Sequence, residues 1–254
     1  MIIFDDVSVT YRGGVHALKN FNLTIEDGEF VVVVGLSGAG KSTMLRALNG
    51  LVPATSGSIT VDGVEVVGAS ASTLRDVRRR IGMIFQTFNL AGRTSVVNNV
   101  LMGRLSYVPA WRSTLGLWPA ADRELAMQAL DRVGIVEKAW VRASDLSGGQ
   151  QQRVGIARAL AQEPSVVLAD EPVAALDPVT SRQVMRDLQR INTDLGITTL
   201  VNLHYLDLAQ EFGQRLIGLR AGELVYDGHI DDVTDQTFSD IYGRSITADD
   251  VKAS

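Results

Sequence analysis

Cysteine is absent from the 254 residues, and histidine occurs only three times. A chain without thiols forms no disulfides and offers no thiol nucleophile and no cysteine-ligated zinc or iron–sulfur site. The three histidines are too scattered to indicate a metal site. These absences exclude thiol catalysis and agree with a reducing compartment.

Long apolar runs are missing as well. The runs that occur, such as residues 30–34, are far shorter than the ~20 residues that cross a bilayer. Asp5 and Asp6 stand where a secretory signal would continue its apolar stretch. We therefore expect a cytosolic location, with any membrane role coming through a partner.

Positive charge is not in excess. The 24 Lys and Arg against 29 Asp and Glu give a net charge of −5, so we expect no nucleic-acid partner. Eight acidic and two basic residues lie in residues 223–254, which we expect to form an acidic C-terminal tail. The rest of the chain is close to neutral, so the net charge does not exclude an anionic ligand.

Two kinds of strand pattern occur. Residues 2–11 and 21–34, with the turn signal Asp27-Gly28 inside the second range, predict antiparallel strands near the amino terminus. Short apolar runs separated by helical patterns predict strands buried on both faces, at residues 30–34, 81–85, 166–169 and 199–203. We therefore predict a single α/β domain over residues 1–254, with a mostly parallel sheet and an N-terminal antiparallel β subdomain.

A helical insertion is predicted between the second and third of these runs. Residues 120–133 have helical periodicity, and we place an inserted α-helical subdomain at about residues 87–150. Trp111 and Trp118 belong to an aromatic, proline-containing part of this region. They either face a partner or fill the small core of the subdomain.

Each of the four apolar runs ends in a residue that packing alone would not select. These residues are Gly35, Gln86, Asp170 and His204. Because ligands of open α/β sheets bind at the carboxyl ends of the strands, we expect the four endings to converge on one site.

The first of these ends opens a phosphate-binding loop. The stretch Gly35-Leu36-Ser37-Gly38-Ala39-Gly40-Lys41-Ser42-Thr43 matches G-x-x-x-x-G-K-[ST] between the strand 30–34 and an apolar helix at 44–51. The glycines let backbone N–H groups surround phosphate oxygens, and the helix start adds roughly half a positive charge. We expect all of these residues except Leu36 to bind the nucleotide, with Lys41 at its terminal phosphates and Ser42 on Mg²⁺.

Two adjacent carboxylates follow the strand 166–169. Asp170 suits the Mg²⁺ shell, held directly or through water. Glu171 suits a general base, because a carboxylate beside the terminal phosphate can orient and deprotonate the attacking water. In isolation such a pair is usually a solvated loop, and the phosphate-binding loop reverses that expectation.

A second candidate anion site begins another predicted helix, at residues 151–162. The stretch Leu146-Ser147-Gly148-Gly149-Gln150 offers Ser147 as a helix N-cap and two glycines, but no lysine. Taken alone, it is either a capped turn or a ligand site.

The two motifs together, in this order, resemble the ATP-binding cassette (ABC) ATPases of membrane transporters over nearly the whole chain. The resemblance implies that two copies pack head to tail, with each ATP between the phosphate loop of one and residues Ser147, Gly148, Gly149 and Gln150 of the other. It implies that Tyr11 stacks on adenine and that Gln86 contacts the Mg²⁺ and water site and the membrane partner. By the same resemblance, His204 contacts the terminal phosphate and Asp177 lies in the loop at the dimer interface. That loop often carries Ser before Leu-Asp, whereas Ala174 and Ala175 stand here, so a hydroxyl contact is not expected.

Three further segments resemble the ATP-binding subunits of bacterial phosphonate importers. They are residues 85–90, residues 201–204, and Gly103-Arg104-Leu105 with Trp111-Arg112-Ser113. This resemblance implies ATP hydrolysis coupled to uptake of an anionic solute, integral membrane permease subunits, and indirectly a substrate-binding protein. It places the chain peripherally at the cytoplasmic face of the bacterial inner membrane.

The sequence leaves other functions open. Phosphite, phosphate esters or another oxyanion would leave the same sequence. An exporter or a lipoprotein-release complex would have the same motifs, and only the Trp111-Arg112-Ser113 region argues against it. A soluble cassette ATPase of DNA repair or translation usually has paired cassettes or a coiled-coil insertion, which this chain lacks. A small-molecule kinase would share the phosphate loop but would not explain residues 146–150.

Overall fold

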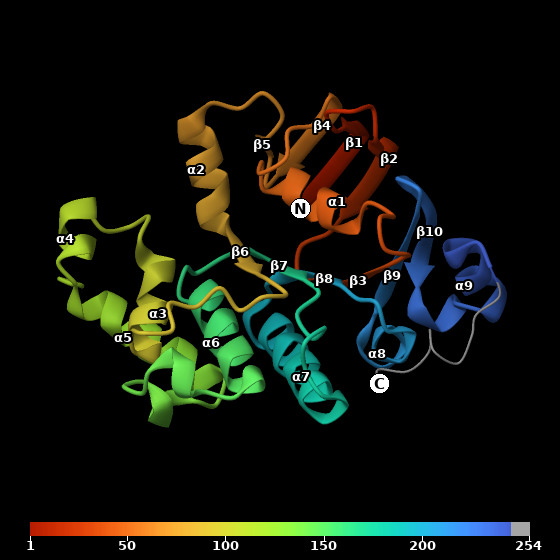
Figure 1. Cartoon of the computed structure of the whole chain (residues 1–254). Helices are drawn as coiled ribbons and strands as arrows, with labels where there is room; N and C mark the ends of the chain where they lie inside the picture. The colour runs from red at the N-terminus through yellow and green to blue at the C-terminus, as the bar shows by residue number, and fades with distance from the viewer. Residues whose placement is uncertain (245–254) are drawn as a thin grey trace.

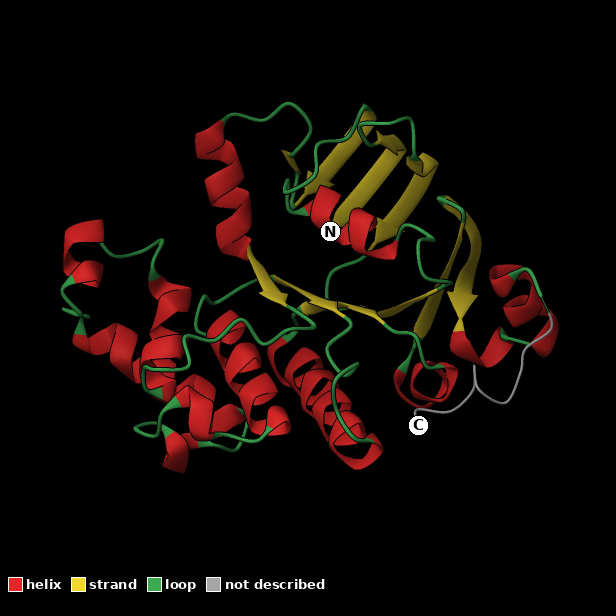
Figure 2. Cartoon of the chain, in the orientation of Figure 1, coloured by secondary structure: helices red, strands yellow, loops and turns green. Residues whose placement is uncertain are grey.

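The computed structural model describes residues 1–244, which form two sheets surrounded by helices (Figures 1 and 2). A four-stranded antiparallel sheet has the order β2-β1-β4-β5, and a six-stranded sheet has the order β10-β9-β3-β8-β7-β6. The first contains β1 (Ile2–Thr10), β2 (His16–Ile25), β4 (Ser56–Val61) and β5 (Val64–Glu65). The second contains β3 (Phe30–Val34), β6 (Ile81–Ile84), β7 (Val166–Asp170), β8 (Thr198–Asn202), β9 (Arg215–Arg220) and β10 (Glu223–His229).

The central sheet is covered on both faces. Phe30, Val32 and Val34 of β3 belong to a core shared with helices, whereas Val31 and Val33 belong to a core shared with the antiparallel sheet and α1 (Lys41–Leu48). Two-sided burial explains why the strand is a continuous apolar run rather than an alternating one. The strands β3, β6, β7, β8 and β9 pair in parallel, and β10 is antiparallel to β9. The predicted α/β fold with a mostly parallel sheet is confirmed.

The interpretation of residues 21–34 as neighbouring antiparallel strands was wrong. The turn at Asp27-Gly28 links two different sheets, because β2 pairs with β1 whereas β3 pairs in parallel with β8 and β9. The burial of β2 alternates along much of its length, while β3 is buried throughout. An alternating strand suits a sheet with one covered face, and an entirely apolar strand is driven to the centre.

Helices connect the strands and cover the central sheet. Their bounds are α2 (Ala71–Arg80), α3 (Val96–Leu101), η1 (Met102–Arg104), α4 (Ala110–Thr114), α5 (Ala120–Arg132), η2 (Val136–Lys138), η3 (Ala143–Asp145), α6 (Gly148–Leu160), α7 (Pro178–Leu195), α8 (Leu206–Phe212), η4 (Ile230–Asp232) and α9 (Asp235–Tyr242). None of the helices within residues 1–244 combines the length and the apolar character that crossing a bilayer requires.

The segment between β6 and α6 is helical and stands at one end of the molecule, beside α6 (Figure 1). The two tryptophans singled out in the sequence differ: Trp118 packs against the larger core, whereas Trp111 is 62% exposed. A third, Trp140, is 77% exposed, which the pattern around it did not indicate. The bounds 87 and 150 of a separate subdomain stay a prediction.

The acidic C-terminal segment is built into the fold as far as it is described. Residues 223–254 begin with β10, which pairs with β9, and continue into α9, where Phe238 and Ile241 are buried. Residues 245–254 of the expected tail lie outside the described residues.

Candidate functional site

The phosphate-binding loop runs from the end of β3 to the start of α1, as expected. Gly35 has φ 148°, and a Cβ atom there would lie 2.2 Å from the Leu219 carbonyl oxygen of β9. Gly40 has φ 110°, and its Cβ would lie 2.5 Å from the Ala17 carbonyl oxygen of β2. Only glycine fits such positions, so both sheets determine where the loop lies.

Lys41 is the first residue of α1, and it is buried, with 4% of its surface exposed. Its Nζ donates to the carbonyl oxygen of Gly35 at 2.6 Å and to that of Leu36 at 3.3 Å. Burial lowers the pKa of Lys41, against the fields of Glu171 and Asp170, which raise it. The ammonium group therefore lies over the loop, with both carboxylates acting on it.

Asp170 ends β7 and receives hydrogen bonds from two neighbouring elements. Ser42 Oγ donates to Asp170 Oδ1 at 2.7 Å, and Asn202 Nδ2 at the end of β8 donates to the same oxygen at 2.9 Å. Arg46 of α1 approaches Oδ2 at 3.5 Å. The expected pair of Ser42 and Asp170 is thus brought together.

Two residues of this cluster, Asn202 and Arg46, were missed from the sequence. A signal for Asn202 existed, because it is a polar residue inside a run otherwise typical of a strand buried on both faces. Arg46 carried no such signal, since one arginine on a helix is usually exposed to solvent.

Glu171 and His204 form a second pair, just beyond the same strand ends. Glu171 Oε1 and His204 Nε2 are 2.5 Å apart, and the Glu171 backbone has φ 53°, uncommon for a residue other than glycine. The side chains are 18% and 36% exposed, respectively, so they open to solvent more than Asp170 does. Two adjacent carboxylates therefore have different surroundings.

Tyr11 lies beside the phosphate loop, and Gln86 follows the strand that pairs with β7. Tyr11 is 39% exposed, and its hydroxyl is 3.1 Å from the Oγ1 of Thr43 in the phosphate loop. Gln86 is exposed in the loop that follows β6, the edge strand. Ser37 and Gly38 are exposed in the phosphate loop, whereas Ala39 is buried.

The second motif forms a capped helix start. Ser147 Oγ accepts a hydrogen bond from the Gln150 backbone N–H at 3.4 Å, and Gln150 Oε1 accepts one from the Ser147 backbone N–H at 3.1 Å. This reciprocal capping box gives Gln150 a role within the turn. Ser147 itself is exposed, so the start of α6 faces solvent.

Asp177 caps the neighbouring helix. Its carboxylate accepts hydrogen bonds from the backbone N–H groups of Val179 and Thr180, at 3.1 and 3.0 Å, and from the Thr180 hydroxyl at 2.5 Å. These hydrogen bonds, that of the Thr180 hydroxyl foremost, lower the pKa of Asp177. A Cβ on Gly149 would lie 2.3 Å from Thr180 Cγ2, so the starts of α6 and α7 are in close contact.

The expected site residues thus fall into two groups. One surrounds the phosphate loop and the ends of β7 and β8, and the other joins the starts of α6 and α7. Among the interactions of residues 1–244, no hydrogen bond or ion pair links residues 147–150 to residues 35–43.

Curated relatives cover nearly the whole chain. The chain is 60% identical over 251 residues to a phosphonates import ATP-binding protein PhnC of Shouchella clausii, which covers 99% of this chain and 94% of that protein. It is 57% identical over 249 residues to the protein of the same name from Staphylococcus aureus, which covers 98% of this chain and 97% of that protein.

Solved structures share the fold. An ATP-binding cassette solved as a dimer in a post-hydrolysis state with ADP and Pi is 36% identical, with a TM-score of 0.79, over 91% of this chain and 99% of that chain. A part of an ABC transporter complex from Clostridium perfringens is 29% identical, with a TM-score of 0.80, over 91% of this chain and 89% of that chain. Residues 18–174, more than half of the chain, match the sequence family described as ABC transporter. The chain belongs to the ABC transporter family.

Proposed function

We propose that this chain is the ATP-binding and ATP-hydrolysing subunit of an importer and that the imported solute is a phosphonate. The observation that carries the hydrolytic function is the convergence of Lys41, Ser42, Asp170 and Glu171 at the ends of β3 and β7. The phosphonate assignment is supported by relatives at 56–60% identity that carry this name.

The residues at the phosphate loop fit a nucleotide with Mg²⁺. Ser42 and Asp170 offer two adjoining oxygen ligands, and Oδ1 of the fully buried Asn202 lacks a hydrogen-bond partner next to them. No group of three or more His, Cys, Asp or Glu within residues 1–244 could hold a metal by itself. A site of this kind suits Mg²⁺, which keeps waters and phosphate oxygens beside one or two protein ligands. When bound, the ion neutralises charge on the phosphate oxygens.

The chain's own groups account for the rest of the reaction. Loop N–H groups and Lys41 hold the terminal phosphates and offset the charge that develops on them. Glu171 accepts the proton of the attacking water. The His204 ring contacts Oε1 of Glu171 and so orients the carboxylate, which leaves Oε2 to accept the proton. Tyr11, beside Thr43, stacks on adenine at the edge of the loop.

The second group of residues acts on a second copy of the chain. Ser147 is exposed at the start of a 13-residue helix, where the backbone N–H groups attract anions but no lysine is present. In a head-to-tail dimer, Ser147, Gly148 and Gly149 complete the ATP site of the partner, and Asp177 positions the loop at the interface. Gln150 acts by shaping the turn.

Integral membrane permease subunits and, indirectly, a substrate-binding protein are the further partners that we propose. Gln86 follows an edge strand and is exposed, so it can report the state of the nucleotide site to the permease. Residues 87–150 act as the helical subdomain in this contact, and the chain works at the cytoplasmic face of the membrane.

The test uses the complete transporter in proteoliposomes with its substrate-binding protein. We expect a phosphonate to stimulate ATP hydrolysis and to accumulate inside, whereas phosphite, a phosphate ester, an amino acid and a sugar stimulate it less. Stimulation by amino acids or sugars alone would refute the phosphonate assignment. Outward transport without a binding protein would indicate an exporter instead.

A further inference from the structure

An unusual apolar surface lies in the helical insertion. Fourteen large apolar side chains are exposed in residues 1–244, and five of them fall within residues 105–117. They are Leu105 (51% exposed), Tyr107 (45%), Trp111 (62%), Leu115 (68%) and Leu117 (46%). The helix in their midst, α4, has no buried residue. We call residues 105–117 the apolar tip.

The base of the apolar tip is firmly held. Arg104 is buried, and its guanidinium donates to Asp122 at 2.8 Å and to the Ala161 carbonyl oxygen at 3.0 Å. The same guanidinium lies 3.9 Å from the centre of the Tyr107 ring, and the Tyr107 hydroxyl donates to the Gln162 carbonyl oxygen at 2.9 Å. The exposed side chains of the apolar tip therefore extend from an ordered base. Because they are exposed, they contribute no burial to the stability of this chain.

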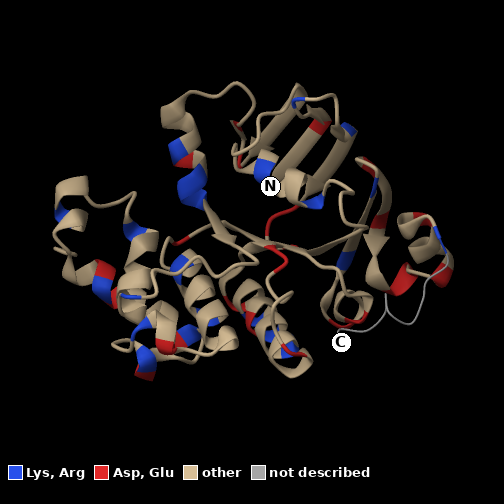
Figure 3. Cartoon of the chain, in the orientation of Figure 1, with Lys and Arg blue, Asp and Glu red and all other residues tan. Residues whose placement is uncertain are grey.

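Charge is distributed unevenly along the molecule. Residues 87–150, which include the apolar tip, contain seven Lys and Arg against five Asp and Glu, a net charge of +2, although the whole chain has a net charge of −5. Residues 223–244 contain six acidic residues and one arginine, and α9 lies at the end of the molecule opposite α4 (Figure 3). An anionic surface would thus attract the end that carries the apolar tip and repel the other end.

The composition of the apolar tip fits a lipid headgroup region. Tryptophan and tyrosine gather at membrane interfaces, and leucines of interfacial segments enter the boundary between headgroups and acyl chains. Arg112 is the one charged residue of the tip, and its guanidinium lies 5.8 Å from the Trp111 ring, so cation and aromatic ring would meet the same surface. A protein partner would have to surround α4 with a complementary groove, because no residue of α4 is buried within this chain.

We propose that the apolar tip docks on a bilayer with anionic headgroups and so turns the helical end of the molecule toward the membrane. This contact adds to the one through permease subunits and rests on the proposed function only for its place in the cell. It requires neither nucleotide nor permease.

The test is flotation of the purified chain with vesicles. Vesicles of phosphatidylcholine with phosphatidylglycerol should bind the chain about five-fold more strongly than phosphatidylcholine alone, since an arginine near an anionic surface contributes ~1 kcal/mol. The double variant Trp111→Ser, Leu115→Ser should lose binding by about ten-fold or more. Because both side chains are exposed, the variant should keep the thermal midpoint and the ATP affinity of the wild type.

Trp140→Ser is the matched control, because it removes a tryptophan that lies outside the apolar tip and is more exposed than Trp111. It should leave vesicle binding unchanged. Brominated lipids should quench the fluorescence of Trp111 in a Trp118→Phe, Trp140→Phe variant and spare that of Trp140 in a Trp111→Phe, Trp118→Phe variant.

Three outcomes would overturn the proposal. The first is a failure of the wild type to float, and the second is equal flotation of the tip variant. The third is loss of assembly with purified permease in detergent on Trp111→Ser, Leu115→Ser without any binding to lipid, which would make the tip a protein interface. None of these outcomes concerns ATP hydrolysis, so the proposed function is judged separately.

Discussion

Replacing Gly35 by alanine tests how closely the phosphate-binding loop is fitted against the sheet. The residue has φ 148°, and its new Cβ would lie 2.2 Å from the Leu219 carbonyl oxygen of the neighbouring strand. Ordinary van der Waals contact begins near 3.4 Å, so loop and strand must separate by about 1 Å.

The cost has two parts. Backbone strain at a conformation that favours glycine costs ~1–3 kcal/mol. Inserting an extra methyl group into packed structure costs a further ~1–3 kcal/mol. We therefore expect the free energy of unfolding to fall by about 2–6 kcal/mol. The displaced loop carries Lys41, and a misplacement of ~1 Å can lower turnover ~10²-fold. Both effects follow from one close approach.

Urea denaturation and steady-state ATP hydrolysis are the assays. Gly63→Ala is the control, because Gly63 has φ 73° in the turn between β4 and β5 and a Cβ there meets no atom within 4 Å. It should cost only ~1–2 kcal/mol and leave hydrolysis intact. Equal stability of the two variants, or normal turnover of Gly35→Ala, would refute the reasoning.

Three further predictions concern charged groups. Glu171→Gln should bind MgATP normally and hydrolyse it ~10²-fold more slowly or worse, because the base is lost while the phosphate loop is intact; near-normal single-turnover rates would remove Glu171 from that role. Asp177→Ala should destabilise the chain at pH 7, as measured by paired thermal melts. Hydrogen bonds lower the pKa of the folded Asp177 carboxylate below its ordinary value of 3.8, so its contribution to stability is lost as the pH falls through the folded pKa. The difference in stability between the variant and the wild type should therefore shrink below pH 3.8. A constant difference would contradict the capping argument. Arg104→Met leaves Asp122 buried without its ion pair and should cost ~3–5 kcal/mol by denaturation, and Asp122→Leu in the same chain should restore part of this; no restoration would argue against the ion pair.

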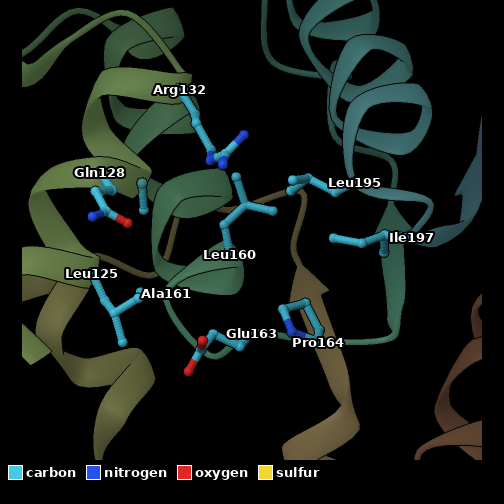
Figure 4. A pocket seen from close by; sticks show the side chains of 10 residues that line it. Leu125, Gln128, Arg132, Leu160, Ala161, Glu163, Pro164, Leu195 and Ile197 are labelled. Carbon is cyan, nitrogen blue, oxygen red and sulfur yellow. The ribbon is translucent and has the colours of Figure 1, made fainter.

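A pocket with a mixed apolar and polar lining lies away from the sequence motifs. It lies between α5 and the C-terminal ends of α6 and α7, with Leu125, Leu160 and Ile197 lining it and Arg132 at its border (Figure 4). Glu163 and Pro164, which precede β7, also line it, so it opens at the sheet edge opposite the nucleotide site. No motif in the sequence marked it, since its lining residues come from three separate segments.

Several features could be predicted because they depend on residues close together in the chain. The strand at residues 30–34 was predicted at its observed bounds, since two-sided burial leaves a continuous apolar run. The phosphate loop, its helix and the capped start of α6 likewise depend on backbone chemistry within a few residues. Asp170 could be placed at a sheet edge because parallel strands end together.

Contacts between distant residues were decided by the tertiary structure. The pairing of β3 with β9 places the Leu219 carbonyl oxygen where only a glycine fits at position 35. The pairing of β7 with β8 brings Asn202 to Asp170. The sheet to which β2 belongs depends on its pairing with β1, which no local pattern states.

The amino-acid sequence by itself determined the nucleotide chemistry and the class of fold, because a phosphate loop and buried strands are specified by local backbone geometry and apolar periodicity. Only the tertiary structure decided how Glu171 meets His204, and which apolar residues of the helical insertion stay exposed. Those outcomes require segments far apart in the chain to pack against one another. The free energy of that packing depends on all of these segments together, so no single segment predicts it.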